Sequence, residues 1–338
     1  MIRSALAGDA LINRGTATMH NIAVIGAGMA GCTLARRLID AGRSVQVFDK
    51  GRAAGGRMAT RAAGRLRFDH GAQFMSVRGE ALQGRLADWQ RAGVIAQWPA
   101  AAIDGDPRWV GVPGMNALAP RLLWGAEIRS QIAITGMGAD RLGWWLAGEA
   151  GMLADCFDAV LVTLPAPQAA GLFERCAGMD IKPFIDAMQD IRYAPCWTLM
   201  LSFAERIGAD DCLRFDAGGA LNWAARDSSK PQRDSAQECW VVHADAQWSQ
   251  DHLECSPEEI EALLLEAFAA ATGCAAMPVH RCAHRWRYAR VIRPLGRPCL
   301  WDADSRLGYA SDGCLGERIE DAFDSANALA DRVLGLVD

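Results

Sequence analysis

The sequence lacks the features of a membrane protein and of a disulfide-rich secreted protein. Its longest uncharged apolar run, residues 21–35, is shorter than the roughly 18 residues that a membrane-spanning helix needs. The eleven cysteines are odd in number and include no Cys-x-x-Cys pair, which argues against a disulfide framework and a zinc site. We therefore expect a soluble, cytoplasmic protein whose thiols are reduced.

A secretion signal is also missing from the N-terminus. The first twenty residues carry Arg3, Asp9 and Arg14, so they contain no unbroken apolar segment. We predict a tail over residues 1–20, with Met19 as an alternative start just before the first strand.

Positive charge and aromatic residues are scarce. The formal net charge is −5 and no basic face is visible, which argues against nucleic acid as a partner. Aromatic residues make up only 7% of the chain, but 12 of the 25 are Trp, so the aromatic surfaces that exist are large and flat. With 338 residues, 51% of them hydrophobic, the chain is long enough for two domains with large cores.

The first part of the chain predicts a β-α-β unit. Residues 21–26 form a short apolar run, residues 28–41 have helical character and end at Gly42, and residues 44–49 form a second apolar run. A polar helix is expected over residues 80–92, and another buried strand over residues 159–163. This order is typical of an α/β fold with a parallel sheet.

Later residues have a different pattern. Strand-like runs over residues 197–203, 239–246 and 284–290 are interrupted by one long helix, which begins with Ser256, Pro257 and Glu259 as a capping box. This pattern predicts an antiparallel sheet domain. A last helix is expected beyond Gly316, because six apolar residues recur there at helical spacing: Ile319, Ala322, Phe323, Ala326, Ala330 and Val333.

A glycine motif connects the first strand to the first helix. Gly26, Gly28 and Gly31 have the G-x-G-x-x-G spacing that permits a tight turn, close approach of a diphosphate and close packing of helix on strand. Asp49 ends the second strand, where a carboxylate accepts hydrogen bonds from a ribose diol. The pattern predicts a dinucleotide site.

Two further motifs favour FAD over NAD as the dinucleotide. Gly55-Gly56-Arg57 follows Asp49 closely, where large flavoproteins often place an Arg toward the diphosphate. Ser311-Asp312-Gly313 precedes the last helix and resembles the site at which flavoproteins hold the ribityl chain. A solvated surface loop is the alternative interpretation of the first of these motifs.

Seven segments together resemble one group of flavoproteins. They are residues 47–58 (VFDKGRAAGGRM), 68–74 (FDHGAQF), 108–115 (RWVGVPGM), 163–169 (TLPAPQA), 241–249 (VVHADAQWS), 284–290 (HRWRYAR) and the C-terminal SDGCLGERIEDAF. On these segments the chain resembles the bacterial renalase-type flavoproteins, relatives of the flavin amine oxidases. The resemblance implies a Rossmann-type FAD-binding domain and an antiparallel-sheet substrate domain, arranged as in p-hydroxybenzoate hydroxylase.

With this resemblance, the chain is expected to pass back and forth between the two domains. We assign residues 21–80, 108–170 and 291–338 to the FAD-binding domain, and residues 81–107 and 171–290 to the substrate domain.

The resemblance also implies an activity. It predicts oxidation of misreduced dihydro-NAD(P), the 2- and 6-dihydro isomers, to NAD(P)+, with a hydride passing to the flavin and then O2 reduced to H2O2. In such chemistry the main role of the protein is to orient the substrate against the cofactor, and acid or base groups matter less. The sequence agrees, because it contains no convincing Ser/His/Asp or Cys/His constellation.

Individual site residues follow from the same resemblance. Those expected to hold FAD are Gly26, Gly28, Gly31, Asp49, Lys50, Gly56, Arg57, Gln73, Trp109, Gly114, Met115, Asp312 and Ile319. Those expected to line the substrate face are His243, His284, Trp286 and Tyr288. A core or sheet-face role is the alternative for each of these four. His280 and His284 lie in a strand-like run and not on a helix, so no metal site is expected.

The chain also departs from its relatives at four positions. Ser311 stands where most relatives have Gly, Gly313 and Asp321 replace a Trp and a Gly around the start of the last helix, and Asp227 replaces a usual Asn. We expect Asp321 to cap its own helix rather than approach the flavin.

Two other functions stay open at this stage. One is an FAD-dependent amine oxidase, although none of the three lysines (Lys50, Lys182 and Lys230) lies in a motif that places it over a flavin. The other is a non-catalytic FAD-binding redox protein.

Overall fold

The computed structural model describes residues 19–102 and 105–337. The tail predicted over residues 1–20 therefore lies almost entirely outside the described part. Within the described residues, no helix is long and apolar enough to cross a membrane.

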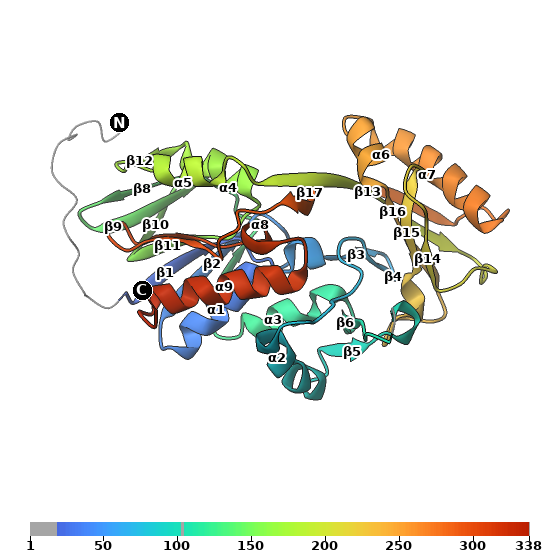
Figure 1. Cartoon of the computed structure of the whole chain (residues 1–338), viewed down its shortest axis with the longest axis horizontal. Helices are drawn as coiled ribbons and strands as arrows, with labels where there is room; N and C mark the ends of the chain where they lie inside the picture. The colour runs from blue at the N-terminus through green and yellow to red at the C-terminus, as the bar shows by residue number, and fades with distance from the viewer. Residues whose placement is uncertain (1–18, 103–104, 338) are drawn as a thin grey trace.

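A six-stranded sheet forms one half of the molecule (Figure 1). Its order is β18 (Leu300–Asp302), β19 (Leu307–Tyr309), β11 (Ala159–Val162), β1 (Asn21–Ile25), β2 (Ser44–Asp49) and β7 (Glu127–Ser130). All neighbours are parallel except the antiparallel pair of β18 and β19. The predicted β-α-β unit is confirmed, with α1 (Met29–Asp40) joining β1 to β2.

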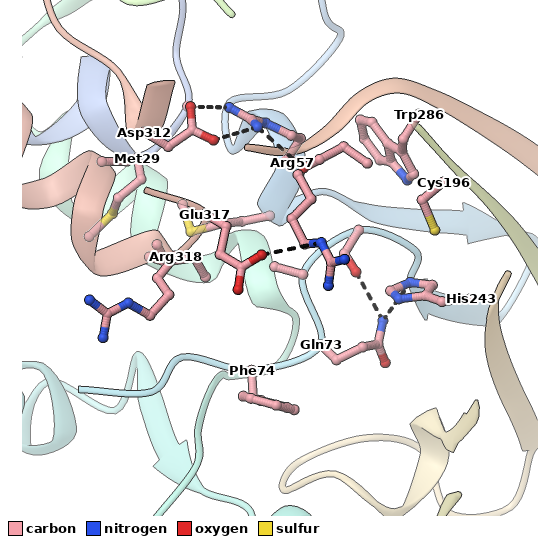
Figure 2. A pocket seen from close by; sticks show the side chains of 18 of the residues that line it. Met29, Arg57, Gln73, Phe74, Cys196, His243, Trp286, Asp312, Glu317 and Arg318 are labelled. Carbon is pink, nitrogen blue, oxygen red and sulfur yellow. Dashed lines mark hydrogen bonds and ion pairs between the residues drawn. The ribbon is translucent and has the colours of Figure 1, made fainter. Parts of the chain in front are cut away.

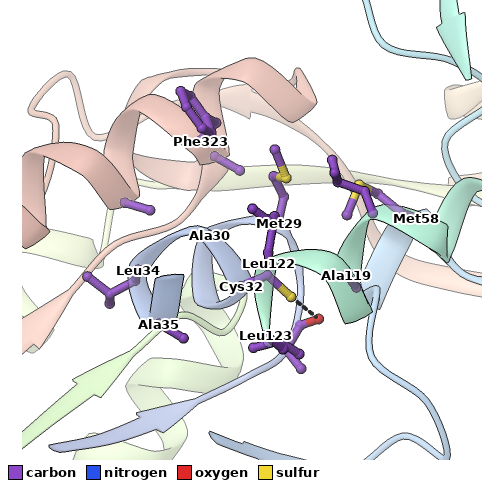
Figure 3. Close-up of a cluster of buried hydrophobic side chains, with 14 of the residues drawn as sticks. Met29, Ala30, Cys32, Leu34, Ala35, Met58, Ala119, Leu122, Leu123 and Phe323 are labelled. Atoms are coloured by element: carbon purple, nitrogen blue, oxygen red, sulfur yellow. Dashed lines mark hydrogen bonds between the residues drawn. The ribbon is translucent and has the colours of Figure 1, made fainter. Parts of the chain in front are cut away.

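Alternate residues of β1 belong to two separate cores, because successive side chains of a strand point to opposite faces. Ile22 and Val24 face a core formed with α1, α2 (Glu80–Arg91), α3 (Leu118–Leu122) and α9 (Ile319–Val333). Figure 3 shows Phe323 of α9 in this core, above Met29 and Ala30 of α1.

The other face of the six-stranded sheet carries a second sheet and two helices. Ala23 and Ile25 of β1 pack there with Trp144 and Phe157. The sheet order is β10 (Gly151–Phe157), β9 (Gly143–Gly148), β8 (Ile134–Asp140) and β12 (Cys176–Ala177), and the helices are α4 (Ala166–Phe173) and α5 (Lys182–Met188). The sequence analysis predicts none of these four strands.

The other half of the molecule contains the predicted antiparallel sheet. Its order is β14 (Cys212–Arg214), β15 (Leu221–Arg226), β16 (Glu238–Ala244), β13 (Arg192–Phe203) and β17 (His280–Arg293). The long helix α7 (Pro257–Thr272) and the short α6 (Ala246–Asp251) cover it (Figure 1). The capping box is present, since the Ser256 hydroxyl accepts from Glu259 N and the Glu259 carboxylate accepts from Ser256 N.

Strands β13 and β17 are longer than predicted. They extend toward the six-stranded sheet as a two-stranded ribbon (Figure 1). Pro195 lies inside β13, and the register shifts between Ala194 and Cys196. The strand continues past the proline because a bulge absorbs the missing N–H donor.

Short elements connect these layers. They are η1 (Gly56–Met58), β3 (Thr60–Ala63), β4 (Leu66–Asp69), β5 (Ile95–Gln97), η2 (Pro99–Ala101), β6 (Trp109–Gly111), η3 (Met115–Ala117), η4 (Asp227–Ser229) and α8 (Asp312–Leu315). Strand β5 pairs with β6, which joins two segments that we assign to different domains. The domain boundaries stay a prediction.

Candidate functional site

A cavity of about 410 Å³ lies between the glycine loop and the antiparallel sheet. Such a volume is typical of a small-molecule site. Figure 2 shows Met29 and Asp312 on one side of it, and Trp286, Cys196 and His243 on the other. Seven of the residues predicted from the sequence line this cavity: Gly28, Arg57, Gln73, His243, Trp286, Asp312 and Ile319.

The glycine loop has the geometry predicted for it. A Cβ on Gly31 would lie 1.9 Å from the carbonyl oxygen of Gly26, so no side chain fits where α1 meets the loop. Gly26 has a φ of +108°, which L side chains rarely adopt. A Cβ on Gly28 would meet no atom within 4 Å, so this position is open toward the cavity.

A second glycine packs directly on the first loop. Gly56 has a φ of +54°, and a Cβ there would lie 3.0 Å from Cα of Gly28. Gly55 N donates to Ala27 O at 2.8 Å and joins the two loops. The predicted Gly-Gly-Arg motif therefore forms part of the same cradle.

The N-terminus of α1 is suited to an anion. Its N-cap residue, Gly28, offers no side chain, so no protein group caps the free N–H groups of the first turn. Asp49 shapes the loop from the end of β2, accepting from Ala27 N at 2.6 Å and from Gly51 N at 2.7 Å. Lys50, next to it, is exposed. An open backbone cradle at an uncapped helix end fits the diphosphate of FAD.

Arg57 and Asp312 form a bidentate pair across the cavity wall. Two guanidinium nitrogens of Arg57 lie 2.6 and 2.7 Å from the Asp312 carboxylate oxygens (Figure 2). Burial alone would lower the pKa of Arg57, but Asp312 holds it above its usual range. Arg57 also reaches the carbonyl oxygens of Tyr288 and Ala289 at 3.3 Å, which ties the motif to β17.

The far wall of the cavity holds a cluster of rings. Trp286 donates from its indole N–H to the carbonyl oxygen of His70 at 2.9 Å. The ring centroid of Trp286 lies 4.4 Å from that of His284 and 5.0 Å from that of His70. His284 does not line the cavity and supports Trp286 from behind. The indole is therefore held by a hydrogen bond and by two imidazoles.

The three imidazoles of this wall are neutral at pH 7. Burial, followed by the charge of Lys230, lowers the pKa of His243 to about 4. Burial and the charge of Arg61 lower the pKa of His284 to about 4. Burial also lowers the pKa of His70 to about 4, with smaller effects from His284 and Arg61.

Several predicted residues lie behind the cavity. Trp109 and Met115 are buried in the core under the cavity, with 6% and 1% of their surface exposed. A Cβ on Gly114 would lie 2.6 Å from the Thr60 hydroxyl, so this glycine permits close packing. Tyr288 stacks edge-on against Tyr193. The structure brings these residues near the site without placing them on its surface, and their contacts with the flavin stay predictions.

Other residues that were not predicted from the sequence also line the cavity. They are mainly Phe74, Cys196, Asn222, Trp223 and Glu317. Phe74 and Trp223 meet edge-on, with ring centroids 5.8 Å apart. The unusual share of Trp is the only sequence signal that points to Trp223.

Three of the four departures from the relatives have hydrogen-bond or ion-pair partners in the structure. Asp321 accepts from Arg318 N at 2.8 Å, so it caps its own helix as expected. The Ser311 hydroxyl bonds the Tyr309 hydroxyl at 2.7 Å. Asp227 is buried beside Lys230, with Nζ 2.6 Å from Oδ1.

Among the described residues, no group of three His, Cys, Asp or Glu side chains could hold a metal ion.

Two family models match the sequence. Residues 24–88 match the NAD(P)-binding Rossmann-like domain. Residues 104–334, more than half of the chain, match the flavin containing amine oxidoreductase family. The chain belongs to the flavin-containing amine oxidoreductase family. Its cofactor is FAD, and it is an FAD-dependent oxidoreductase.

A curated relative supports the same family assignment. Renalase of Mus musculus is 23% identical over 295 residues, which cover 81% of this chain and 86% of renalase. This match makes the chain a renalase-like member of the amine oxidoreductase family.

Solved structures share the fold. Cyclohexylamine oxidase from Brevibacterium oxydans has a TM-score of 0.72 at 12% identity, with 94% of this chain and 99% of that chain covered. An oxidoreductase from Methanosarcina mazei has a TM-score of 0.65 at 13% identity, with 92% and 100% covered. The mixed α/β fold with a Rossmann-like domain is thereby confirmed.

Proposed function

We propose that this flavoprotein oxidises misreduced dihydro-NAD(P), the 2- and 6-dihydro isomers, to NAD(P)+. The observation that carries the proposal is that the rings of Trp286 and His243 line the cavity on the side opposite Asp312 (Figure 2). A planar dihydronicotinamide ring stacks well on such a surface. The renalase-like sequence supports the same substrate class.

The protein groups of this wall orient and shield the substrate. FAD supplies the hydride acceptor and returns the electrons to O2. Trp286 cannot rotate freely, because its N–H is bound to the His70 carbonyl. A fixed ring that holds the substrate within reach of the cofactor lowers the entropic cost of the transfer.

The reaction balances without an acid or base from the protein. The dihydropyridine loses one hydride and becomes a pyridinium cation. O2 takes up the two electrons with two protons, one derived from the hydride and one from solvent, and gives H2O2. The neutral imidazole of His243 suits this product, because a histidinium ion there would repel the developing positive charge.

Amine oxidation is the alternative that the family and the cyclohexylamine oxidase fold raise. The cavity offers little to a cationic amine. Of the residues that line it, the carboxylates of Asp312 and Glu317 are paired with Arg57 and Arg290. A neutral amine would bind against the same aromatic wall, so the two substrates must be separated by experiment.

Product analysis under air tests the proposal. Each dihydro-NAD(P) isomer should yield one NAD(P)+ and one H2O2 per molecule consumed, while ordinary NADH and a panel of amines yield H2O2 far more slowly. Aldehyde and ammonia from an amine, with no NAD(P)+ from either isomer, would identify an amine oxidase. No turnover of any of these substrates, with FAD bound, would favour a non-catalytic flavoprotein.

A further inference from the structure

A cluster of four buried charges lies directly behind the cavity wall. Lys230 contacts Asp69 at 3.1 Å and Asp227 at 2.6 Å, and Arg233 also pairs with both carboxylates. None of the four side chains is more than 3% exposed. Burial alone would raise the pKa of Asp69, but Lys230 and Arg233 lower it to about 2. Burial and the neighbouring charge of Asp69 raise the pKa of Asp227, although Lys230 and Arg233 act in the opposite direction.

Lys230 also makes a contact toward the cavity. Its Nζ lies 3.2 Å from Oε1 of Gln73, and Gln73 lines the cavity where Lys230 does not. An ammonium group only donates hydrogen bonds, so the oxygen of the Gln73 amide must face Lys230. The amide nitrogen then faces the other way, where it donates to the carbonyl oxygens of Asp69 and Gly71.

The same amide nitrogen faces His243. Nε2 of Gln73 lies 3.5 Å from Nε2 of His243, at the long end of the hydrogen-bond range (Figure 2). The amide nitrogen carries only hydrogens, so a proton on His243 Nε2 would place two donors against each other. Nε2 is therefore the acceptor, and the single proton of the neutral ring lies on Nδ1.

We propose that Lys230 is a positioning residue for the oxidation proposed above, and that it acts through Gln73 to hold His243 as the neutral Nδ1–H tautomer. The inference rests on the proposed function for its role in the reaction, but the tautomer itself does not. The contact with Lys230 holds the carbonyl oxygen of Gln73, which leaves the amide nitrogen on the side of Asp69 O, Gly71 O and Nε2 of His243. The wall then stays uncharged while the nicotinamide ring becomes a cation.

The tautomer can be read directly in the holoenzyme labelled with [15N]histidine. His243→Asn identifies the His243 signals by their loss. In the wild type we expect Nδ1 protonated and Nε2 unprotonated. In Gln73→Glu, which keeps a partner for Lys230 but loses the N–H donor, the proton should appear on Nε2. Nε2–H in the wild type, or an unchanged pattern in Gln73→Glu, would overturn the proposal.

A double-mutant cycle tests whether Lys230 acts through Gln73. When a dihydro-NAD(P) isomer reduces the flavin anaerobically, Lys230→Met should lower the rate at least about tenfold. An effect of this size lies within the range of interaction energies between residues in contact. In a Gln73→Leu background the same change should alter the rate less than about twofold. Equal slowing in both backgrounds would show that Lys230 only supports the fold.

Lys182→Met is the matched control, since Lys182 is an exposed lysine with its own ion pair to Asp186. It should change neither the rate nor the tautomer. If Lys230→Met fails to fold because Asp69 and Asp227 lose a partner, Lys230→Gln, which keeps a hydrogen-bonding group at this position, takes its place in the cycle. If no dihydro-NAD(P) isomer reduces the flavin, the proposed function fails, while the tautomer of His243 in the Lys230 variant separately tests whether Lys230 acts through Gln73.

Discussion

At the scale of single residues, Asp49 fixes the glycine loop by accepting from Ala27 N and Gly51 N. Each of its oxygens keeps a further lone pair, which a ribose diol would use. We therefore expect the same carboxylate to take part in cofactor binding as well.

Replacement of this carboxylate should weaken FAD binding. We expect Asp49→Ala to cost about 1.5–3 kcal/mol of binding free energy, because a charged acceptor is lost. Asp49→Asn, which keeps an acceptor oxygen, should lose less. Titration of the apoprotein with FAD measures both, and Asp40→Ala on the exposed end of α1 is the control. An unchanged FAD affinity in Asp49→Ala would leave Asp49 with a purely structural role.

The buried histidines make stability depend on pH. The pKa values of His70, His243 and His284 are lowered to about 4 in the folded protein, whereas an unfolded histidine titrates near 6.5. As the pH falls from about 6.5 toward 4, the unfolded chain binds protons that the folded chain excludes. The free energy of unfolding must therefore fall over this window.

Urea unfolding of the FAD-saturated protein between pH 7.5 and 5 measures this effect. Each histidine contributes a slope of up to about 1.4 kcal/mol per pH unit. His243→Gln should flatten the slope, because it removes one of the three groups. A slope that is the same in wild type and variant would contradict the neutral state of His243.

Two single residues show which roles can be predicted from the sequence and which cannot. Gly31 could be predicted, because the need for a missing side chain follows from a local turn. Lys230 could not, because its partner Asp69 is 161 residues away and its contact with Gln73 depends on how the two halves of the molecule meet.

At the scale of elements, helix α9 closes the chain and carries its own cap. Asp321 accepts from Arg318 N, and Arg318 donates back to both Asp321 oxygens. These three bonds hold the carboxylate at the helix end. We therefore expect it to stabilise the helix and not to approach the flavin.

Loss of this cap should affect stability and spare the flavin. We expect Asp321→Gly to lower the free energy of unfolding by about 0.5–2 kcal/mol, as for other N-terminal capping groups. The midpoint potential of the bound flavin should stay within a few millivolts of wild type. A rise of roughly 20 mV, equivalent to about 1 kcal/mol for a two-electron couple, would place the carboxylate near the flavin instead.

Elements with local signals are the ones that the sequence predicts. Helices α1, α7 and α9 have a glycine loop, a capping box and an apolar repeat, respectively, and the predicted ranges match. Strands β8 and β9 could not be predicted, because Gly136, Gly138 and Gly143 interrupt their alternation. Their pairing is set by packing on the six-stranded sheet.

At the scale of the whole molecule, the cavity forms where two sheets meet. The ribbon of β13 and β17 runs between them and brings Trp286 to a wall that faces the glycine loop (Figure 1). Residues 28, 73, 243 and 312 reach the cavity from four separate parts of the chain. Family resemblance could assign them to one site, but local sequence patterns alone could not.

This placement predicts graded effects at Trp286. Trp286→Ala should slow anaerobic flavin reduction by up to about 10²-fold, since misplacement of the substrate by about 1 Å has such a cost. Trp286→Phe keeps a ring but loses the bond to His70, so its effect should be smaller. A normal reduction rate with a lowered melting temperature in Trp286→Ala would make the indole a packing residue only.

We propose that dihydro-NAD(P) isomers are the substrates of this cavity. Anaerobic mixing of the holoenzyme with each compound, while the flavin absorbance is followed, tests this proposal. A 2- or 6-dihydro isomer should bleach the flavin within seconds, much faster than ordinary NADH or any amine. Rapid bleaching by an amine, with none by either isomer, would contradict it.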